Sequence, residues 1–402
     1  MKNTKMPTIR FKGFNDDWEQ RKWMNSVDIS TEMVDPASGE YDDMPHIAPG
    51  NIESFTGRIL DNVRTVKEEQ LISGKFRFRP DDVVYGKINP QLGKYFYASV
   101  DGLTSADAYV FKGKNGIRQK FLFSMLQTSD FFKYSVSVSK RSGMPKINRD
   151  ELNAYAFLAP SEEEQDKIGN FLLEIDHLIT LHQRKLEKIK LMKKSMLGKM
   201  FSRDAESIPK IRFDGYTDDW EQRKFGDLGS VAMCKRVFKE QTTSVGEIPF
   251  YKIGTFGAEP DAFISRELFE EYKSKFQYPN VGDMLISASG TIGRTVEYSG
   301  EEAYFQDSNI VWFKHDDRID NSFLRCIYNI VKWNGIEGST IKRLYNDNFL
   351  KTEFYMPTAG EQAKIGAYFR SLDHLITLHQ RKLEKLKKVK KSLLEHMFPT
   401  EK

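Results

Sequence analysis

The chain has 402 residues, 39% of them hydrophobic and 13% aromatic, so it can form buried cores and is not expected to be disordered. Its 61 basic and 57 acidic residues give a formal net charge of only +4, which by itself points to no class of partner. Two cysteines, Cys234 and Cys326, exclude a disulfide framework and a cysteine-rich zinc site. Because we find no signal-type apolar stretch at the start and no window of membrane-spanning character, we expect a cytoplasmic protein.

The chain contains one unit written twice. Residues 7–23, PTIRFKGFNDDWEQRKW, match residues 209–225, PKIRFDGYTDDWEQRKF, at 12 of 17 positions. Residues 162–201 match residues 359–398 at 25 of 40 positions, and thirteen consecutive residues in this match, DHLITLHQRKLEK, recur unchanged 197 positions later. The stretches between these segments share little. The pattern predicts a duplicated architecture in which each unit has a constant beginning, a variable domain and a constant helix.

Both variable domains show the pattern of mixed α/β structure. In the first, residues 1–160, the runs DDVVYG and YAFLAP predict strands, and Phe121–Met125 is expected to be helical. In the second, residues 202–357, the runs DMLISAS, SNIVWFK and EFYMP predict strands, and Ser322–Val331 is expected to be helical. Frequent glycine and asparagine residues separate these runs, as is typical of short strands joined by turns.

A constant helix is expected after each domain, at residues 161–201 and 358–402. Capping boxes of the S/T-x-x-E type, Ser161–Glu164 and Thr358–Glu361, predict the two helix starts. Apolar residues then follow at alternating steps of four and three, which predicts a coiled coil. We call the inward positions of this heptad pattern the seam, and its central members are Ile175, Ile179, His182, Leu186, Leu372, Ile376, His379 and Leu383.

Polar residues interrupt this seam at four places. His182 and His379 are expected to fix the register of the helices, as polar seam residues often do. A metal site or a pH-sensitive site between the helices is the alternative for this pair. Lys193 and Lys390 are expected to extend toward solvent or to mark where the seam opens.

The charges along the two helices predict their relative direction. The first helix begins with an acidic stretch and the second ends with a strongly basic one, so parallel pairing would place two basic stretches side by side. Antiparallel helices of about forty residues would hold the two domains at opposite ends of a rod about 60 Å long. The predicted fold class is therefore α+β, with two mixed α/β domains in a tandem pseudo-two-fold repeat joined by two long antiparallel coiled-coil helices.

Tests for catalytic motifs identify no catalytic residues and no metal ligands. The sequence has no GxxxxGK[ST] loop. Asn89–Leu92, NPQL, lacks the second proline and the aromatic residue of an adenine methyltransferase motif. Pro260 and Asp261, followed by Glu271–Lys273, have the spacing of a metal-dependent nuclease, but the second segment is polar and helix-like. We therefore expect no enzymatic activity in this chain.

Basic and hydroxyl-rich loops stand at equivalent places in the two units and predict contact with duplex DNA. KRSGMPKINR and GSTIKRLYND both precede the last strand of their domain, and KINPQLGK is the counterpart of ISASGTIGRT. Lysine and arginine attract phosphates and bind guanine, and hydroxyl groups complete a set that reads bases. The predicted DNA-binding residues are Lys87, Lys94, Lys140, Arg141, Lys146, Arg149, Ser287, Ser289, Thr291, Arg294, Thr340, Lys342, Arg343 and Tyr345. Because the domains differ, two different half-sites about one helical turn (roughly 34–36 Å) apart are expected.

The arrangement closely resembles the specificity subunit of type I restriction-modification enzymes, in which two target-recognition domains alternate with two near-identical helices. The resemblance is carried by PSEEEQDKI after residue 159, PTAGEQAKI after residue 356 and the doubled DHLITLHQRKLEK. The loop SASGTIGR also resembles one that is common in these recognition domains, whereas the first domain keeps only Gly93 and Lys94 there. The resemblance covers the whole chain.

The resemblance implies a non-catalytic chain that binds a split, asymmetric DNA sequence, with one half read by each domain. Its helices would set the spacing and bind two methyltransferase (modification) subunits, which methylate adenine with S-adenosylmethionine. Restriction endonuclease/translocase subunits that use ATP and Mg would join this core. The chain itself would hold no cofactor and would contact no membrane.

Three other classes of function fit parts of the pattern. The chain could be the specificity subunit of a different methylating nuclease, or a stand-alone DNA-binding regulator with the same architecture, which would bind its operator without a partner. A coiled-coil adaptor with protein-binding domains is the third class, and it gives no reason for paired basic loops.

Overall fold

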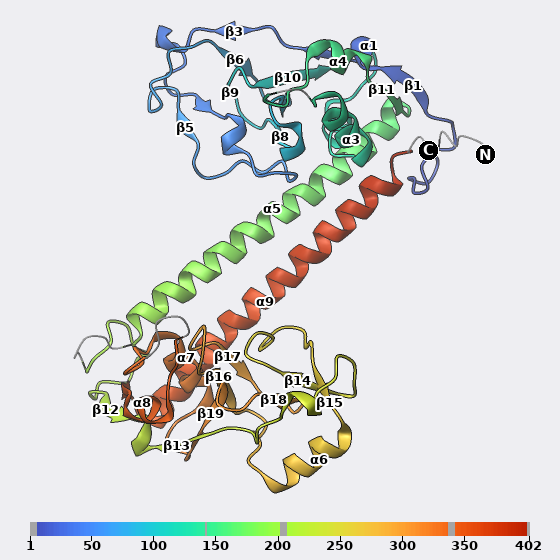
Figure 1. The fold of residues 1–402 in the computed structure, drawn as a ribbon. Helices are drawn as coiled ribbons and strands as arrows, with labels where there is room; N and C mark the ends of the chain where they lie inside the picture. Colours follow the sequence, from blue (N-terminus) through green and yellow to red (C-terminus); the bar gives the residue numbers. More distant parts are fainter. Residues whose placement is uncertain (1–5, 141–142, 202–206, 337–341, 400–402) are drawn as a thin grey trace. The chain divides into compact units, whose positions relative to one another are not determined.

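The computed structural model describes residues 6–140, 143–201, 207–336 and 342–399, and the chain divides into two compact units. The first unit contains residues 1–186 and 379–402, and the second contains residues 187–378. Each unit therefore contains one variable domain, the adjoining half of its own long helix, and half of the other long helix (Figure 1).

The first unit has a central antiparallel sheet of four strands in the order β2-β10-β7-β8 and a second sheet in the order β3-β6-β9-β4-β5. Strand β1, in the constant segment at the start of the unit (residues 7–23), pairs with β11, the strand that directly precedes the long helix. The strands are β1 Glu19–Lys22, β2 Val27–Ile29, β3 Met33–Val34, β4 Pro45–His46, β5 Arg64–Thr65, β6 Lys75–Phe78, β7 Val83–Gly86, β8 Tyr95–Tyr97, β9 Gly102–Thr104, β10 Ala108–Gly113 and β11 Ala156–Ala159. The helices are α1 Trp23–Ser26, α2 Gln119–Met125, α3 Ser129–Val138, α4 Arg149–Ala154 and α5 Glu162–Lys199, with short 3-10 turns η1 Pro36–Ser38, η2 Pro49–Asn51 and η3 Pro90–Leu92.

The second unit repeats the central sheet, in the order β13-β19-β16-β17, and the short ladder, now β12 with β20. Its other sheet differs and has the order β15-β14-β18. The strands are β12 Glu221–Lys224, β13 Gly229–Ala232, β14 Ile248–Tyr251, β15 Phe263–Ile264, β16 Met284–Ser287, β17 Thr295–Glu297, β18 Tyr304–Phe305, β19 Ile310–His315 and β20 Glu353–Met356. The helices are α6 Arg266–Lys275, α7 Asn321–Ile330, α8 Asn346–Lys351 and α9 Ala359–His396, with turns η4 Phe225–Asp227 and η5 Lys239–Gln241.

The structure confirms the predicted fold class. All five predicted strands are present, as β7, β11, β16, β19 and β20, and the two predicted helical segments are α2 and α7. The segment of the tested nuclease motif is the helix α6, so the geometry that this motif requires does not form.

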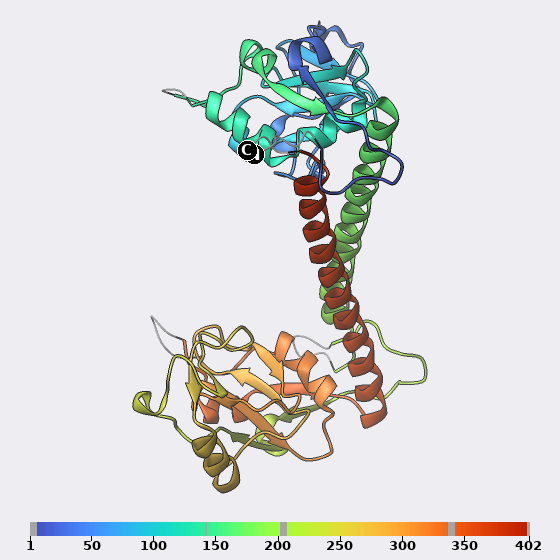
Figure 2. The same ribbon diagram turned by 90° about the vertical axis from the view of Figure 1, so that its right-hand side faces the viewer.

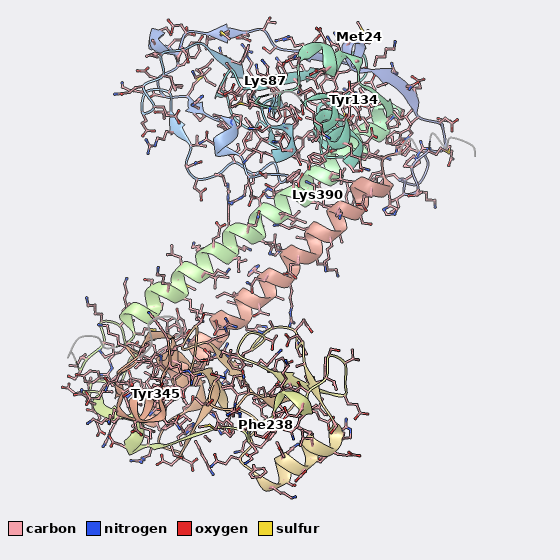
Figure 3. The ribbon with its side chains drawn as sticks, in the orientation of Figure 1. Met24, Lys87, Tyr134, Phe238, Tyr345 and Lys390 are labelled. Atoms are coloured by element: carbon pink, nitrogen blue, oxygen red, sulfur yellow. The ribbon has the colours of Figure 1, made fainter. Side chains whose placement is uncertain are left out.

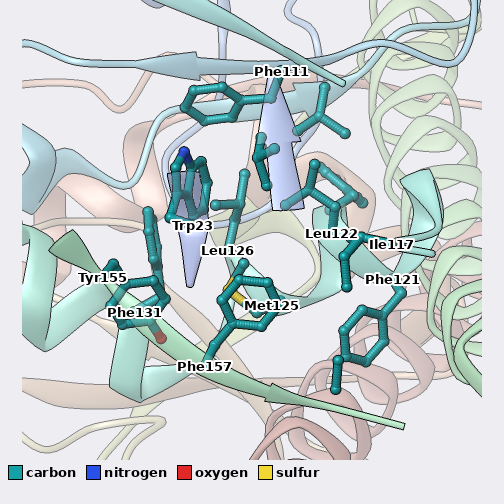
Figure 4. Packing of buried hydrophobic residues seen from close by; sticks show 14 of the residues in the cluster. Trp23, Phe111, Ile117, Phe121, Leu122, Met125, Leu126, Phe131, Tyr155 and Phe157 are labelled. Carbon is teal, nitrogen blue, oxygen red and sulfur yellow. The ribbon is translucent and has the colours of Figure 1, made fainter. Parts of the chain in front are cut away.

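Aromatic side chains fill the core of the first unit. Trp23, Phe111 and Phe131 are at most 1% exposed and pack around the central sheet, with Trp23 and Phe131 stacked at 5.8 Å between ring centroids (Figure 4). Ile168 and Leu172 of α5 belong to the same cluster. Since the domain shares its core with the beginning of its helix, the two form one cooperative body, and truncating a ring such as Trp23 is expected to cost about 3–5 kcal/mol.

An arginine from the constant beginning ties each domain to its long helix. In the first unit Arg10 donates two hydrogen bonds, at 2.8 and 2.7 Å, to the carboxylate of Glu164. In the second unit Arg212 binds Glu361 in the same way, at 2.9 and 2.7 Å. Both carboxylates are 0% exposed. The two helices begin at Glu162 and Ala359, directly after Ser161 and Thr358, as the capping boxes predict, and the glutamates of these boxes bind arginine.

Helices α5 and α9 run side by side in opposite directions, which confirms the predicted antiparallel pairing (Figures 1 and 2). In the first unit Asp176 of α5 contacts Lys390 of α9, and His182 of α5 contacts His379 of α9. The later residue of α5 therefore contacts the earlier residue of α9, as in an antiparallel pair. The predicted seam positions face inward: Ile175, Ile179, Leu186 and Leu372 are buried, and His182, Ile376, His379 and Leu383 are half-buried.

Candidate nucleic-acid interface

The central sheet of the second unit presents two of the predicted loops together at one edge. Strand β16 ends at Ser287 and pairs there with Ile310, the first residue of β19. The following loop is joined to the segment 342–345 by backbone hydrogen bonds from Gly290 to the Lys342 carbonyl and from Leu344 to the Ala288 carbonyl, both at 2.9 Å. The loop of residues 286–295 and the segment 342–345 therefore lie side by side.

The first unit builds the same edge with different residues. Gly86, the last residue of β7, pairs with Ala108, the first residue of β10. Asn89 donates to the Pro145 carbonyl at 2.8 Å, and Ile147 donates to the Lys87 carbonyl at 3.0 Å, in the register seen in the second unit. Both units thus use one backbone frame to display two loops whose side chains differ.

Two predicted residues of the first unit lie over one aromatic ring, and a third, Lys146, lies near one of them. The Lys87 ammonium lies 5.0 Å and the Arg149 guanidinium 5.7 Å from the ring centroid of Tyr109. Burial, with the neighbouring Lys146 second, lowers the pKa of the Lys87 ammonium. A group of like charges is unfavourable unless an anion approaches it, so this cluster of Lys87, Lys146 and Arg149 suits a phosphate. Figure 3 labels Lys87 in this unit.

Not every predicted residue of the first unit is equally available. Arg149 donates to the carbonyls of Ile29 and Ser30 at 3.1 and 2.9 Å, which positions the guanidinium and satisfies part of it. Lys94 donates to the Ile52 carbonyl. Lys140 is exposed, and Arg141 lies outside the described residues. DNA binding by all of these residues stays a prediction.

The predicted serines of the second unit hold the loop in shape. Ser287 is 1% exposed; its hydroxyl donates to the Thr291 carbonyl at 2.5 Å and accepts from the Arg294 amide at 2.9 Å. Ser289 is 4% exposed and donates to the side-chain oxygen of Asn309 at 2.7 Å. These hydroxyls are already bonded and buried, so we now assign them to positioning the loop rather than to direct contact with a base.

The exposed side chains of this edge come from both loops. Thr291, Lys342, Arg343 and Tyr345 are exposed, and Tyr345 is 49% exposed (Figure 3). Arg294 is also exposed, although its guanidinium donates to the Phe256 carbonyl at 2.9 Å. The predicted Thr340 lies outside the described residues.

The seam lysines form ion pairs, so the prediction that they extend toward solvent is wrong. Lys390 is 7% exposed and binds Asp176 and the side-chain oxygen of Gln127 within the first unit. Burial lowers the pKa of Lys390 and raises that of Asp176, and the attraction between the two opposes both shifts. In the second unit the equivalent Lys193 binds Asp373 at 2.5 Å. The doubled aspartate of DHLITL therefore meets the doubled lysine of the other helix.

His182 and His379 contact each other in the seam, with 2.8 Å between their Nδ1 atoms. One Nδ1 must donate and the other accept, so the contact holds only while at least one ring is neutral. Burial, followed by repulsion from His379, Lys382 and Lys185, lowers the pKa of His182. The pair supports the predicted register role, since equivalent residues of the two copies meet here.

A basic and aromatic segment after β13 escaped the prediction. Lys235, Arg236, Phe238 and Lys239 are exposed, while the intervening Val237 is buried. The signal was present in the letters KRVFK, but this segment has no basic counterpart in the first unit, and the prediction required recurrence in both.

Other kinds of site receive no support from the described residues. Within the four described ranges, no group of three or more histidine, cysteine, aspartate or glutamate side chains could hold a metal ion. Burial raises the pKa of both cysteine thiols, Cys234 and Cys326, to about 12, which makes them poor nucleophiles. Among the helices that the structure describes, none has the length and apolar character needed to cross a membrane.

The fold and the two matching sheet edges define a protein made of two copies of one domain, each followed by a long helix. The family model for the type I restriction modification DNA specificity domain matches residues 16–191 and 217–388. The chain therefore belongs to this family.

Relatives agree with the assignment, and a solved structure has a similar fold. A putative type I restriction enzyme specificity subunit from Haemophilus influenzae is 56% identical over 158 residues, which are 38% of this chain and 41% of the relative. The type I restriction enzyme EcoDI specificity subunit from Escherichia coli is 30% identical over 167 residues, 42% of this chain and 35% of the relative. The chain thus spans less than half the length of these two relatives. The fold is similar to the crystal structure of a type I restriction-modification S subunit from M. genitalium, with a TM-score of 0.68, 15% identity, and coverage of 99% of this chain and 100% of that one.

Proposed function

We propose that this chain is the non-catalytic specificity subunit of a type I restriction-modification complex and binds a bipartite, asymmetric DNA target. The observation that carries the proposal is the shared sheet edge. Gly290 with Lys342 in one unit, and Asn89 with Pro145 in the other, join the same two loops in the same register. One frame that displays two sets of side chains is suited to reading two different sequences by direct contacts in a groove.

The partners follow from the family and from the duplicated helix. The segment DHLITLHQRKLEK is identical in both copies, although a helix pair needs only its seam positions to be alike. Two copies of one binding surface suit two modification subunits, which would methylate adenine with S-adenosylmethionine. Restriction endonuclease/translocase subunits, using ATP and Mg, would act from the same complex.

The test is a methylome. The chain is co-expressed with its neighbouring methyltransferase subunit in a host without adenine methylation, and methylated positions are read by single-molecule sequencing. We expect methyladenine in one split, asymmetric motif, absent when this chain is omitted. A stable complex that methylates nothing, with tight DNA binding by the chain alone, would instead indicate a DNA-binding regulator.

A second experiment tests the division of labour within the chain. Exchanging residues 24–160 for another recognition domain is expected to change one half of the motif and leave the other half unchanged. Inserting a few residues into both constant helices is expected to widen the gap between the halves without changing either. A gap that stays the same while a half-site changes would contradict the spacing role of the helices.

A further inference from the structure

The second unit carries basic and aromatic side chains at the end of β13 that the loops described above do not include. We call Lys235, Arg236, Phe238, Lys239 and Phe276 the aromatic–basic patch. The Arg236 guanidinium lies 5.6 Å from the ring centroid of Phe238, and the Lys235 ammonium lies 5.0 Å from that of Phe276. Phe238 is 49% and Phe276 42% exposed (Figure 3 labels Phe238).

The segment that contains Lys235–Lys239 leaves the central sheet at the edge where the predicted loops lie. Strand β13 pairs antiparallel with β19 and runs toward the start of β19, with its last residue, Ala232, opposite Trp312. The end of β16 also lies there, because Ser287 pairs with Ile310. The segment after β13 and the loop after β16 therefore leave the central sheet at one edge, with Asn309 bonded to Ser289 between them.

The backbone around Phe238 is held in place. Cys234 and Val237 are buried in the core on either side of the basic residues. Phe238 precedes the turn η5, its amide donates to the side-chain oxygen of Gln241 at 2.9 Å, and its carbonyl accepts from the Gln241 amide at 3.0 Å. The half-exposed ring is thus presented from a fixed backbone, which reduces the entropy that binding would lose.

The charge of the segment favours an anionic partner. In the part of the chain that the structure describes, none of Lys235, Arg236 and Lys239 forms an ion pair with a carboxylate. Cations beside exposed rings are a combination that nucleic-acid surfaces use, because cations bind phosphates while rings pack against sugars and bases. Counted along the chain from the matching strands β2 and β13, the first unit has Met33 and Val34 in place of Lys235 and Arg236 and so lacks these two cations.

We infer that the aromatic–basic patch is a second DNA contact of the second domain, with Arg236 and Lys239 on phosphates and the Phe238 ring against sugars or bases of its half-site. The inference rests on the proposed function. With this patch, the second domain contacts more of its half-site than the two loops alone would contact.

The experiment uses the full chain in complex with its methyltransferase subunit and duplexes that carry the motif found in the methylome. Phe238→Ala is expected to weaken binding roughly tenfold, within the range for losing an aromatic contact to a base. Phe238→Tyr, which keeps the ring, is expected to bind like wild type. Arg236→Ala should lower the slope of log affinity against log salt by about 1, as expected when one phosphate contact is lost.

The control is Val281→Ala, because Val281 is 72% exposed in the same unit but precedes β16 and so lies at its opposite end. It is expected to bind like wild type. Thermal unfolding of each variant confirms that an exposed substitution leaves the fold intact. Unchanged binding by Phe238→Ala overturns the inference, as does a loss of methyltransferase subunit from the complex with DNA affinity unchanged, which makes the patch a protein contact. A wild-type complex that binds no duplex overturns the proposed function itself.

Discussion

The two units keep the same scaffold contacts and differ at the edge of their central sheets. Arg10 with Glu164 and Arg212 with Glu361 are the same buried pair in two copies. At the sheet edge, the first unit places Lys87 and Arg149 over Tyr109, whereas in the second Ala288 and Asn346 hold the places of Lys87 and Arg149. The difference teaches that the contacts which hold a domain on its helix are kept, while the displayed side chains are free to vary because no core contact depends on them.

The largest expected effect comes from breaking the shared arginine–glutamate pair. Arg10→Ala and Arg212→Ala each remove the charged partner of a fully buried carboxylate, so each is expected to destabilise its own unit by about 3–5 kcal/mol. The loss should be smaller for Arg212→Ala, because Glu361 also accepts a hydrogen bond from the Trp220 indole at 3.2 Å. Urea unfolding combined with hydrogen exchange in each unit measures the effect. An unchanged stability of either unit would contradict the role of its pair, and Glu164→Gln in the Arg10→Ala background should restore part of the loss.

Loss of the lysine is expected to destabilise the two copies of the seam ion pair to different extents. Side-chain exposure is 9% and 12% for Lys390 and Asp176, but 22% and 21% for Lys193 and Asp373. Lys390→Ala should therefore destabilise the first unit by about 3 kcal/mol, and Lys193→Ala the second by about 1 kcal/mol.

The double variant Lys390→Met with Asp176→Leu serves as the control for that comparison. It removes both charges at once and is expected to be close to neutral, because no buried charge is left unpaired. Equal losses for the two single lysine variants would show that burial does not distinguish the copies.

The cation cluster of the first unit is expected to govern the salt dependence of DNA binding. Lys87→Ala and Lys146→Ala should each lower the slope of log affinity against log salt by about 1, with the recognised sequence unchanged. Binding titrations at several salt concentrations measure this slope. Lys120→Ala, which removes a lysine bonded to Asn170 of α5, is the control and should leave the slope unchanged. A changed half-site after either substitution would place that lysine on a base instead of a phosphate.

The smallest expected effect is a pH dependence of the helix pair. The pKa of His182 is lowered below its ordinary value of 6.5 by burial, so the unfolded chain takes up this proton at a higher pH than the folded chain does. The stabilisation is therefore present above about pH 6.5 and lost as the pH falls through the lowered pKa. The free energy of unfolding in urea should fall between pH 7.5 and 5.5 for wild type. It should fall less for the double variant His182→Asn with His379→Asn. Identical pH profiles would exclude a role for the pair.

The sequence by itself determined the repeat, the seam and the direction of the helices. The two identical copies of DHLITLHQRKLEK are visible in the sequence, and the spacing of apolar residues and the distribution of charge are properties of each segment that do not depend on tertiary structure. The five strands were found for the same reason. The sequence also identified the loops of the sheet edge, because Lys87–Lys94 and Ile286–Thr295 recur at equivalent places.

Only the tertiary structure decided which polar side chains serve the scaffold. In the sequence Glu164 looks like part of a helix cap and Ser287 like a base contact. Folding brings Arg10 to Glu164 from another segment, and the loop that contains Ser287 closes so that its hydroxyl donates to the Thr291 carbonyl. Lys390 is buried because Asp176, 214 positions earlier, lies opposite it. The partners of a polar group come from the packing of distant segments, and burial then decides whether that group remains available to bind DNA.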